Sequence, residues 1–402
     1  MSGVRLPVVG TLLRKEILST LRDRRALVST LLLPLLLIPL LMVGFPLLFG
    51  GLAERESSAV SRVGVQGEVP PALFALLGEA GVELVPSADL RGAVEADEFA
   101  GALALPEGFA ARLEAGESAQ VQLYAKVGNL RSELVTSKLR GALERYRQAL
   151  VGERLERAGL SAELLEPFAL ETVDASSEQE RGAGFLGWLI PYFIAIFTLT
   201  GGQTTAIDAT AGEKERGTLE SLLVAPVGRL EVVLGKAAAT LLFGLAASLV
   251  GILSYLLSGY LLGRLGGGEL TAGLGGSLSF DPEALLVLLV SSLLMAALVA
   301  SLLVGIAMTA RSFKQAQSYL APLSFVMILP GLLLQFADFF ALSPWLYALP
   351  VFNILLLLND AVRGQALAPQ ILLTWGSSLL YAGLCLLLAY RNFQREDVLF
   401  RS

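Results

Sequence analysis

Long apolar runs separated by short charged loops are the feature that most constrains the fold of this chain. They lie at 26–49, 183–207, 232–262, 284–310, 319–336 and 371–390. The first run has 24 residues. As a helix it would extend about 36 Å, more than the roughly 30 Å hydrocarbon core of a bilayer. Backbone groups at that depth need hydrogen-bond partners within the protein. We therefore predict an α-helical polytopic membrane protein with six transmembrane helices.

The composition supports this class and excludes several others. The chain is 54% hydrophobic and 16% charged, whereas soluble domains carry about 25% charged residues. It has no histidine, which excludes a Ser-His-Asp triad, a His-activated cysteine and the usual zinc sites. Cys385 is its one cysteine, so no internal disulfide can form.

Residues 50–182 differ from the rest because they are charged and hold no long apolar run. Alternating and apolar stretches predict strands near 63–65, 82–84, 102–105 and 121–124, with helices between them. A long helix is expected over 129–159. Strands that alternate with helices indicate a mixed α/β domain inserted after the first run. The stretch 51–53 has signal-peptide cleavage spacing, but the apolar run before it is too long for a signal peptide, so we expect a retained span.

The distribution of basic residues predicts the topology. Lysine and arginine gather in 208–231, in the loop between the fourth and fifth runs, and in the tail 391–402. By the positive-inside rule these segments and both termini are cytoplasmic, and the inserted domain 50–182 is extracytoplasmic. Residues 1–25 read as a basic amphipathic helix, with Val9, Leu13, Ile17 and Leu21 on its apolar side. Such a helix suits the membrane surface, and a plain positively charged flank is the alternative.

Residues 337–370 contain two short apolar pieces, 342–348 and 351–358. Pro344 and Pro350 interrupt them. Neither piece is long enough to cross a bilayer. We expect re-entrant or interfacial helices on the outer side.

A short charged segment, 208–231, connects the second and third runs. Thr210 and Glu213 have capping-box spacing, and Arg216 lies at ion-pair spacing from Glu213 and Glu220. These patterns predict a helix over 210–226 that starts near Thr210 and ends at Pro226. Leu219, Leu222 and Leu223 would form an apolar face shaped to dock onto another protein. An ordinary polar loop with local ion pairs is the alternative.

The order of residues in this segment resembles the cytoplasmic coupling segment of ABC-2 type transporter permeases. The similar positions are Glu213, Lys214, Glu215, Arg216, Gly217, Thr218, Leu219, Glu220, Leu222, Leu223, Ala225, Pro226, Arg229, Gly235 and Lys236. The stretch 101–109 also resembles the extracytoplasmic domain of such permeases, and the layout is most similar to the sodium-efflux branch. The resemblance implies a coupling helix that contacts a separate ABC ATPase subunit, and a complex of two permease copies with two ATPases. ATP and Mg²⁺ would then bind to that partner.

No nucleotide site is visible in the chain itself. A P-loop ending at Gly235 and Lys236 would need glycine where Leu230 stands and Ser or Thr where Ala237 stands. Dinucleotide-binding, metal-binding and nucleophile motifs are absent from the sequence too. We expect a transport subunit without an enzyme activity or cofactor of its own, and without a nucleic-acid partner.

Polar side chains within the apolar runs are the candidates for a transport path. The second run offers Thr198, Thr200, Gln203, Thr204 and Asp208; weaker candidates are Ser324, Gln335, Asn353, Asn359 and Asp360. Hydroxyl, amide and carboxylate oxygens suit a hard cation, so a sodium path at Gln203 and Thr204 is one interpretation. The alternative is that these groups bond to their own helix or to a neighbouring one.

These observations predict the permease subunit of an ATP-driven exporter, with sodium as the expected cargo. Export of drugs, lipids or peptides is the alternative within transport. A non-transporting mechanotransmission or receptor subunit is the alternative outside it, and four spans rather than six would favour that class.

Overall fold

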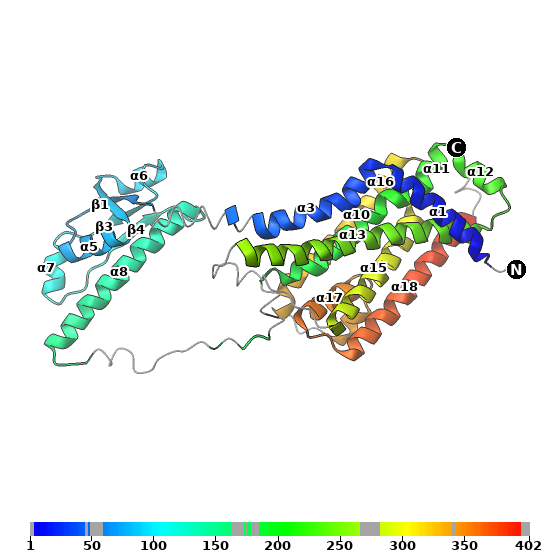
Figure 1. Cartoon of the computed structure of the whole chain (residues 1–402). Coiled ribbons are helices and arrows are strands. Elements are labelled where there is room, and N and C mark those ends of the chain that lie inside the picture. Colours follow the sequence, from blue (N-terminus) through cyan, green and yellow to red (C-terminus); the bar gives the residue numbers. More distant parts are fainter. Residues whose placement is uncertain are drawn as a thin grey trace. The chain divides into compact units, whose positions relative to one another are not determined.

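The computed structural model describes residues 4–44, 47–48, 59–161, 173, 175–177, 180, 185–265, 282–339 and 343–394. The chain divides into two compact units. Met1–Pro46 and Ala175–Ser402 make up the helical unit, and Leu47–Asp174 makes up the α/β unit. Figure 1 shows helices throughout the first and a sheet with helices in the second.

A four-stranded mixed sheet organises the α/β unit. Its strands are β1 (Ser61–Gln66), β2 (Val82–Pro86), β3 (Gly101–Ala104) and β4 (Gln122–Ala125), in the order β2-β1-β3-β4. The first three are parallel, with Val63 opposite Leu84 and Val65 opposite Leu103, while β4 runs antiparallel to β3. Alternation of valine and leucine therefore indicated the strands to within a few residues.

Two apolar cores flank this sheet. One joins β1 and β3 to α5 (Pro71–Glu79) and α8 (Leu130–Arg157), through Val63, Leu73, Leu77, Leu103 and Leu139. The other packs α6 (Leu90–Glu95) and Phe99 against Ala102. Helix α8 starts at Asn129, whose side-chain oxygen accepts a hydrogen bond from the Ser132 amide at 3.1 Å. Helix α7 (Phe109–Glu114) lies between β3 and β4 in the chain.

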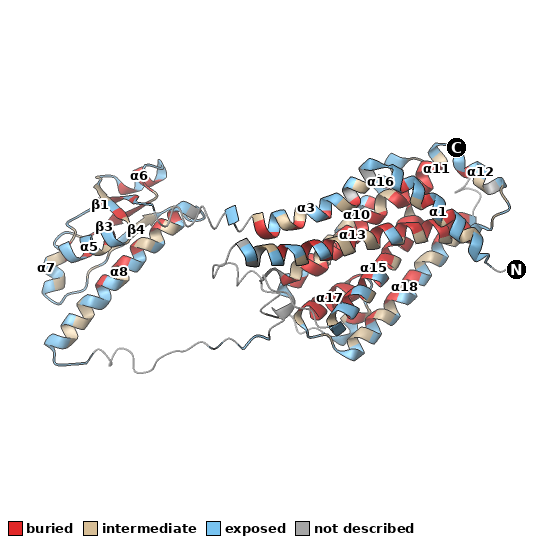
Figure 2. Ribbon diagram, viewed as in Figure 1, coloured by how far each residue is buried: buried red, intermediate tan, exposed pale blue. Residues whose placement is uncertain are grey.

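The helical unit is built around α10 (Leu189–Ile207). This helix packs on α13 (Arg229–Leu265), α15 (Pro282–Ala307) and α16 (Phe313–Leu333), and α15 packs in turn on α18 (Ala368–Gln394). Gly201 makes the approach of α10 to α13 very close, because a Cβ there would lie 2.5 Å from the Ala247 Cβ and 2.9 Å from the Phe243 oxygen. Small residues of this kind let helices pack tightly in a bilayer. Figure 2 shows buried residues concentrated along α10, α13 and α15.

Four of the described helices are long and apolar enough to cross a membrane. They are Arg229–Leu261, Pro282–Ala307, Phe313–Phe336 and Ala368–Gln394. These helices match the last four predicted runs. The second run forms the continuous helix α10, which carries Thr198, Thr200, Gln203, Thr204 and Thr205. The first run forms α2 (Arg24–Leu27), η1 (Val28–Leu32), α3 (Leu33–Pro39) and η2 (Leu40–Gly44), whose apolar stretch Thr30–Gly44 is shorter than a span. Six crossings stay a prediction.

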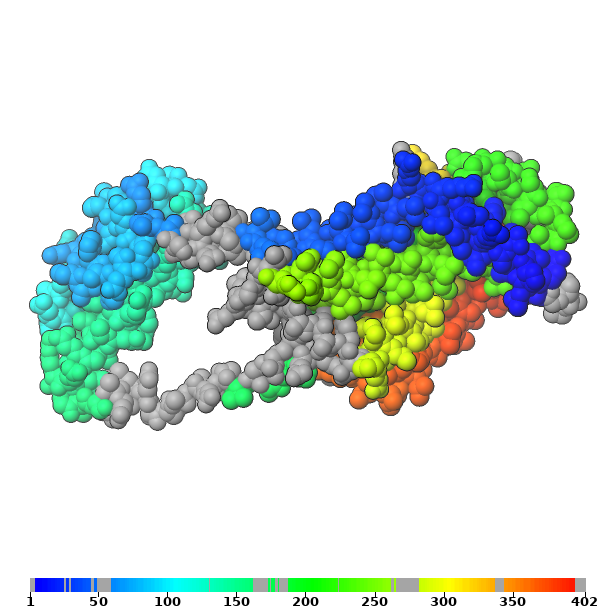
Figure 3. Space-filling view, in the orientation of Figure 1, coloured from blue at the N-terminus to red at the C-terminus, as the bar shows by residue number. Residues whose placement is uncertain are grey.

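Helix α1 (Leu6–Arg22) occupies the predicted N-terminal amphipathic position, but its buried side differs from the expected one. The buried residues are Leu12, Glu16 and Thr20, whereas Leu21, assigned to the apolar stripe, is exposed. Val9, Leu13 and Ile17 of that stripe are half-buried, so the membrane-surface role of α1 stays a prediction. Helix α1 and the first apolar run lie along α13, as Figure 3 shows.

The segment after α16 contains η6 (Leu334–Phe339), the short η7 (Pro344–Ala348) and α17 (Phe352–Arg363). Residues 353–362 of α17 are all buried, packed mainly by α15 and α18. Val351 precedes α17 with a φ of +72°, a strained conformation for a β-branched residue. The piece 351–358 therefore lies in a covered helix, whereas η7, in the piece 342–348, buries Tyr347 and leaves Trp345 60% exposed.

Candidate functional site

The charged segment between α10 and α13 does not begin with a new helix. Helix α10 continues through η5 (Asp208–Gly212) into α11 (Glu213–Glu215), and the Thr210 hydroxyl donates to the Ala206 oxygen at 2.6 Å. The predicted capping box at Thr210 and Glu213 was therefore wrong, since no residue between 208 and 216 stops the helix. The break comes at Gly217, whose φ of +70° suits glycine, and α12 (Thr218–Val224) follows.

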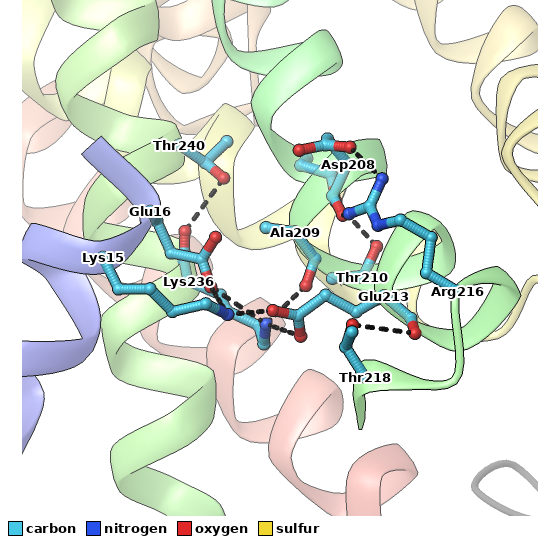
Figure 4. Close-up of polar contacts among 11 residues, drawn as sticks. Lys15, Glu16, Asp208, Ala209, Thr210, Glu213, Arg216, Thr218, Lys236 and Thr240 are labelled. Atoms are coloured by element: carbon cyan, nitrogen blue, oxygen red, sulfur yellow. Dashed lines mark hydrogen bonds and ion pairs between the residues drawn. The ribbon is translucent and has the colours of Figure 1, made fainter. Parts of the chain in front are cut away.

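A buried charge cluster anchors this segment to two other helices. Lys236 of α13 is only 1% exposed. Its ammonium group donates to Glu213 Oε2 at 2.5 Å, to Glu16 Oε1 of α1 at 3.1 Å and to the Ala209 oxygen. Lys15 of α1 also pairs with Glu213, and with Glu16 at 3.2 Å. Figure 4 shows the four charged groups converging from α1, α11 and α13.

The cluster is electrically balanced, with two ammonium groups and two carboxylates. Burial acts to raise the pKa of Glu213, but the charges of Lys236 and Lys15 outweigh it and hold that pKa below its ordinary value. Buried ion pairs contribute little net stability against apolar replacements, yet removing one partner is strongly destabilising because a charge is left uncompensated. The arrangement therefore fixes the relative positions of α1, α11 and α13.

A second charge contact joins the start of α1 to the end of the segment. Glu231 accepts hydrogen bonds from the Arg5 side chain at 2.9 and 3.0 Å, and from the Arg5 amide at 2.8 Å. Arg5 also donates to the Pro226 oxygen at 2.7 Å, and the Gly228 amide donates to Glu231 at 2.8 Å. Both ends of the charged segment are thus held against α1.

Helix α11 also contacts the turn between α15 and α16. Lys214 donates to the carbonyl oxygens of Met308 and of Ala310, the latter at 3.3 Å, and Glu215 accepts from the Phe313 amide at 2.7 Å. A cation beside the C-terminus of α15 and an anion at the N-terminus of α16 complement the two helix dipoles. Burial lowers the pKa of Lys214 to about 8.

The side chains of α12 divide between the protein and its surface. Leu219 is buried in the helical core and Leu222 is half-buried, so these two predicted docking leucines pack within the chain. The side chain of Leu223 lies outside the described residues. Glu220 is exposed and Val224 is 88% exposed. Leu219 and Leu222 therefore do not form the predicted docking face, and for Leu223 it stays a prediction.

The predicted ion pairs of the segment also form differently. Arg216 pairs with Asp208 at 2.8 Å, while Glu213 points to Lys15 and Lys236. The exposed positions Glu215, Arg216, Gly217, Thr218, Glu220 and Pro226 remain as the surface that a partner could reach.

The candidate path residues of α10 lie on two different sides of that helix. Thr198 is buried and donates to its own helix at Ile194, 2.7 Å away, and Thr200 does the same at Ile196, 3.0 Å away. For Thr198 and Thr200 the structure thus shows the alternative, in which the hydroxyl groups bond to their own helix. Thr200, Gln203, Thr204 and Asp208 are half-buried and follow helical spacing, so they form one partly exposed polar stripe.

Three of the weaker candidates, Asn353, Asn359 and Asp360, are buried residues of α17. Asn353 donates to Ser377 at 2.9 Å and to Ser378 at 3.0 Å, and Asp360 accepts from the Tyr347 hydroxyl at 2.5 Å. Asn359 is also buried. Ser324 of α16 is half-buried, and Gln335 of η6 is exposed. The hydrogen bonds of Asn353 and Asp360 therefore hold α17 against α18 and η7.

The sequence analysis missed four charged residues of the site: Arg5, Lys15, Glu16 and Glu231. Their partners lie up to 226 positions away, so no local spacing could show the pairs. One signal was present, because Glu16 is the sole acidic residue in an otherwise basic helix.

Comparisons with known proteins agree with this layout. A family model described as "ABC-2 family transporter protein" matches residues 11–398. The chain is similar to the ABC transporter permease protein NatB of Bacillus subtilis (strain 168), at 25% identity over 389 residues. That alignment covers 95% of this chain and 97% of the relative.

Proposed function

This chain belongs to the ABC-2 family of transporter proteins, and we propose that it is the permease subunit of an exporter driven by a separate ABC ATPase through 208–228. The observation that carries the proposal is the buried cluster around Lys236. It ties the segment to α1 and α13, while Lys214 and Glu215 tie it to the α15–α16 turn. A displacement of this segment would therefore be transmitted to α1, α13, α15 and α16.

The exposed side of the segment is the proposed contact for the ATPase. Glu215, Arg216 and Glu220 offer charged groups, and Val224 offers an apolar side chain. Glu213 keeps the coupling role expected from the resemblance, but it lies beneath this exposed side. Because it is buried, it would transmit the movement rather than touch the partner.

The proposed cargo path runs along the polar stripe of α10. Thr200, Gln203, Thr204 and Asp208 are partly exposed in the single chain, and amide and carboxylate groups facing lipid would be costly. A second copy of the permease on this side would enclose the stripe and let two such stripes face one another. The proposed path therefore depends on the proposed homodimer, because the second copy encloses it.

Sodium is the cargo that we propose, because the stripe offers hydroxyl, amide and carboxylate oxygens, which suit a hard cation. Drugs, lipids or peptides are the alternative cargo. Six crossings, cytoplasmic termini and an extracytoplasmic α/β unit are part of the same proposal. The four candidate spans leave the non-transporting receptor class as the rival.

Reconstitution in vesicles with the partner ATPase tests the proposal. We expect sodium to stimulate ATP hydrolysis and to move across the membrane with it. Gln203→Ala should reduce the sodium flux while the complex still assembles. Hydrolysis that ignores sodium but responds to an amphipathic drug would support the alternative cargo, and an assembled complex that moves nothing would support the receptor class.

A further inference from the structure

The α/β unit has an apolar groove that the transport proposal does not use. It has a volume of 710 Å³ and lies between α7, the segment 115–121 and α8. Along α8 its lining extends from Ser137 to Leu150, about 20 Å at 1.5 Å per residue. Leu113, Val121, Leu143 and Leu150 are half-buried there, so the groove presents apolar surface to solvent.

A glycine keeps the groove open. Gly141 lies within α8, and no heavy atom stands within 4 Å of the position that its Cβ would occupy. Glycine inside a helix is less stable than alanine by roughly 1 kcal/mol. Neither tight packing nor a positive φ explains Gly141, since its site is open and helical. Its open position leaves room for an elongated ligand to lie over α8 at this point.

The charged residues at the rim indicate the sign of the charge on that ligand. Arg140 and Arg147 both line the groove, and Arg147 pairs with Glu144 at 2.5 Å. Among the described residues Arg140 has no ion-pair partner. The described part of the unit, 59–161, has 14 acidic and 11 basic residues and is net negative, whereas the three charged groups of the groove sum to +1. One guanidinium group is therefore available for one anionic head.

We propose that this groove binds a long-chain carboxylate, a molecule of the fatty-acid type. Its acyl chain would lie over Gly141 between Leu143 and Leu113, and its carboxylate would pair with Arg140. A guanidinium matches a carboxylate with two parallel hydrogen bonds, which makes Arg140 the residue that selects for the acid. The inference stands apart from the coupling and cargo proposals.

Photolabelling of the full-length protein in nanodiscs with a diazirine-bearing hexadecanoic acid tests the site. Peptide mapping should find label in 109–121 and 137–150. Gly141→Phe fills the groove, and we expect it to reduce that labelling about tenfold or more. Gly152→Phe is the matched control, because Gly152 is also an open helical position on α8 but does not line the groove. Equal unfolding temperatures would show that both variants are folded.

The head group is tested with a second pair of variants. Arg140→Gln should weaken labelling by the acid about tenfold, which corresponds to the loss of one charge-assisted hydrogen-bonded contact. It should leave labelling by the matching alcohol unchanged. Arg145→Gln, an exposed position on the same helix, should change neither.

Several results would overturn the assignment. Label confined to the helical unit, equal labelling by acid and alcohol, or indifference to Gly141→Phe would each do so. Cross-links between two copies of the chain from Arg140→Cys would show that a second copy covers the groove instead.

Discussion

Lys236 is the residue on which the coupling geometry depends most. In Lys236→Met, Glu213 and Glu16 would share one remaining ammonium group, that of Lys15. We expect a loss of roughly 3–5 kcal/mol in the free energy of unfolding, because a buried carboxylate is left uncompensated. Thermal unfolding of the purified permease measures it.

The double variant Lys236→Met/Glu213→Gln separates charge balance from packing. It restores neutrality with one lysine and one glutamate, so it should recover much of the lost stability. A double variant as unstable as the single one would contradict the charge argument. Its ATPase coupling should stay low, since α13 and α11 are no longer joined by an ion pair.

Lys214 gives the segment a predicted pH dependence. Its pKa in the folded chain is about 8, below the ordinary 10.5. Between these values the unfolded chain binds more protons than the folded one, so the free energy of unfolding should rise as pH rises from 8 to 10.5. Lys214→Met should abolish this rise, and Lys314→Met, at an exposed position, should keep it. If the free energy of unfolding of Lys214→Met rises with pH as steeply as that of the parent, the lowered pKa of Lys214 is not its cause.

At the scale of elements, the contact between α10 and α13 is the most extensive one among the described helices. Gly201→Ala would bring a methyl group 2.5 Å from Ala247 and should destabilise the protein by about 1–3 kcal/mol. Gly383→Ala in α18 is the control, because nothing lies within 4 Å of its Cβ position and helix propensity favours alanine. If both variants unfold at the parent temperature, the close approach is not needed.

Helix α12 is the element whose surface should decide partner binding. Val224→Asp adds a charge to an 88% exposed position, so the stability of the permease should change by less than about 0.5 kcal/mol. Its affinity for the ATPase should fall by about tenfold or more, because the charge would have to be desolvated in the complex. Val127→Asp, in a fully exposed position of the α/β unit, should bind the ATPase normally. Titration of the ATPase against each purified variant provides the comparison.

Over the whole molecule, patterns with local causes were predictable from sequence. Apolar runs located the four candidate spans, and the alternation around Val63 and Val82 located strands β1 and β2. Glu213 was identified as a coupling residue by resemblance, but its burial was not predicted. Its buried position depends on Lys236 and Glu16, which reach it only after three helices have packed together.

Errors at the segment have the same origin. The capping box at Thr210 assumed a helix start, although α10 continues through Gly212 into α11 and the break comes only at Gly217. The burial of Glu16 in α1 was likewise not predictable, because it depends on Lys236, which is 220 positions away. Tertiary contacts between distant charges carry no local periodicity, so no pattern in a single chain could supply them.

Cross-linking at α12 tests the central claim most directly. Val224→Cys, in a Cys385→Ala background, should cross-link to the ATPase subunit in membranes from cells that contain both proteins, and the yield should change when ATP is bound. Val127→Cys should give no such product. Absence of any ATPase cross-link from Val224→Cys in an assembled, ATP-hydrolysing complex would contradict the proposal that the motor acts through 208–228.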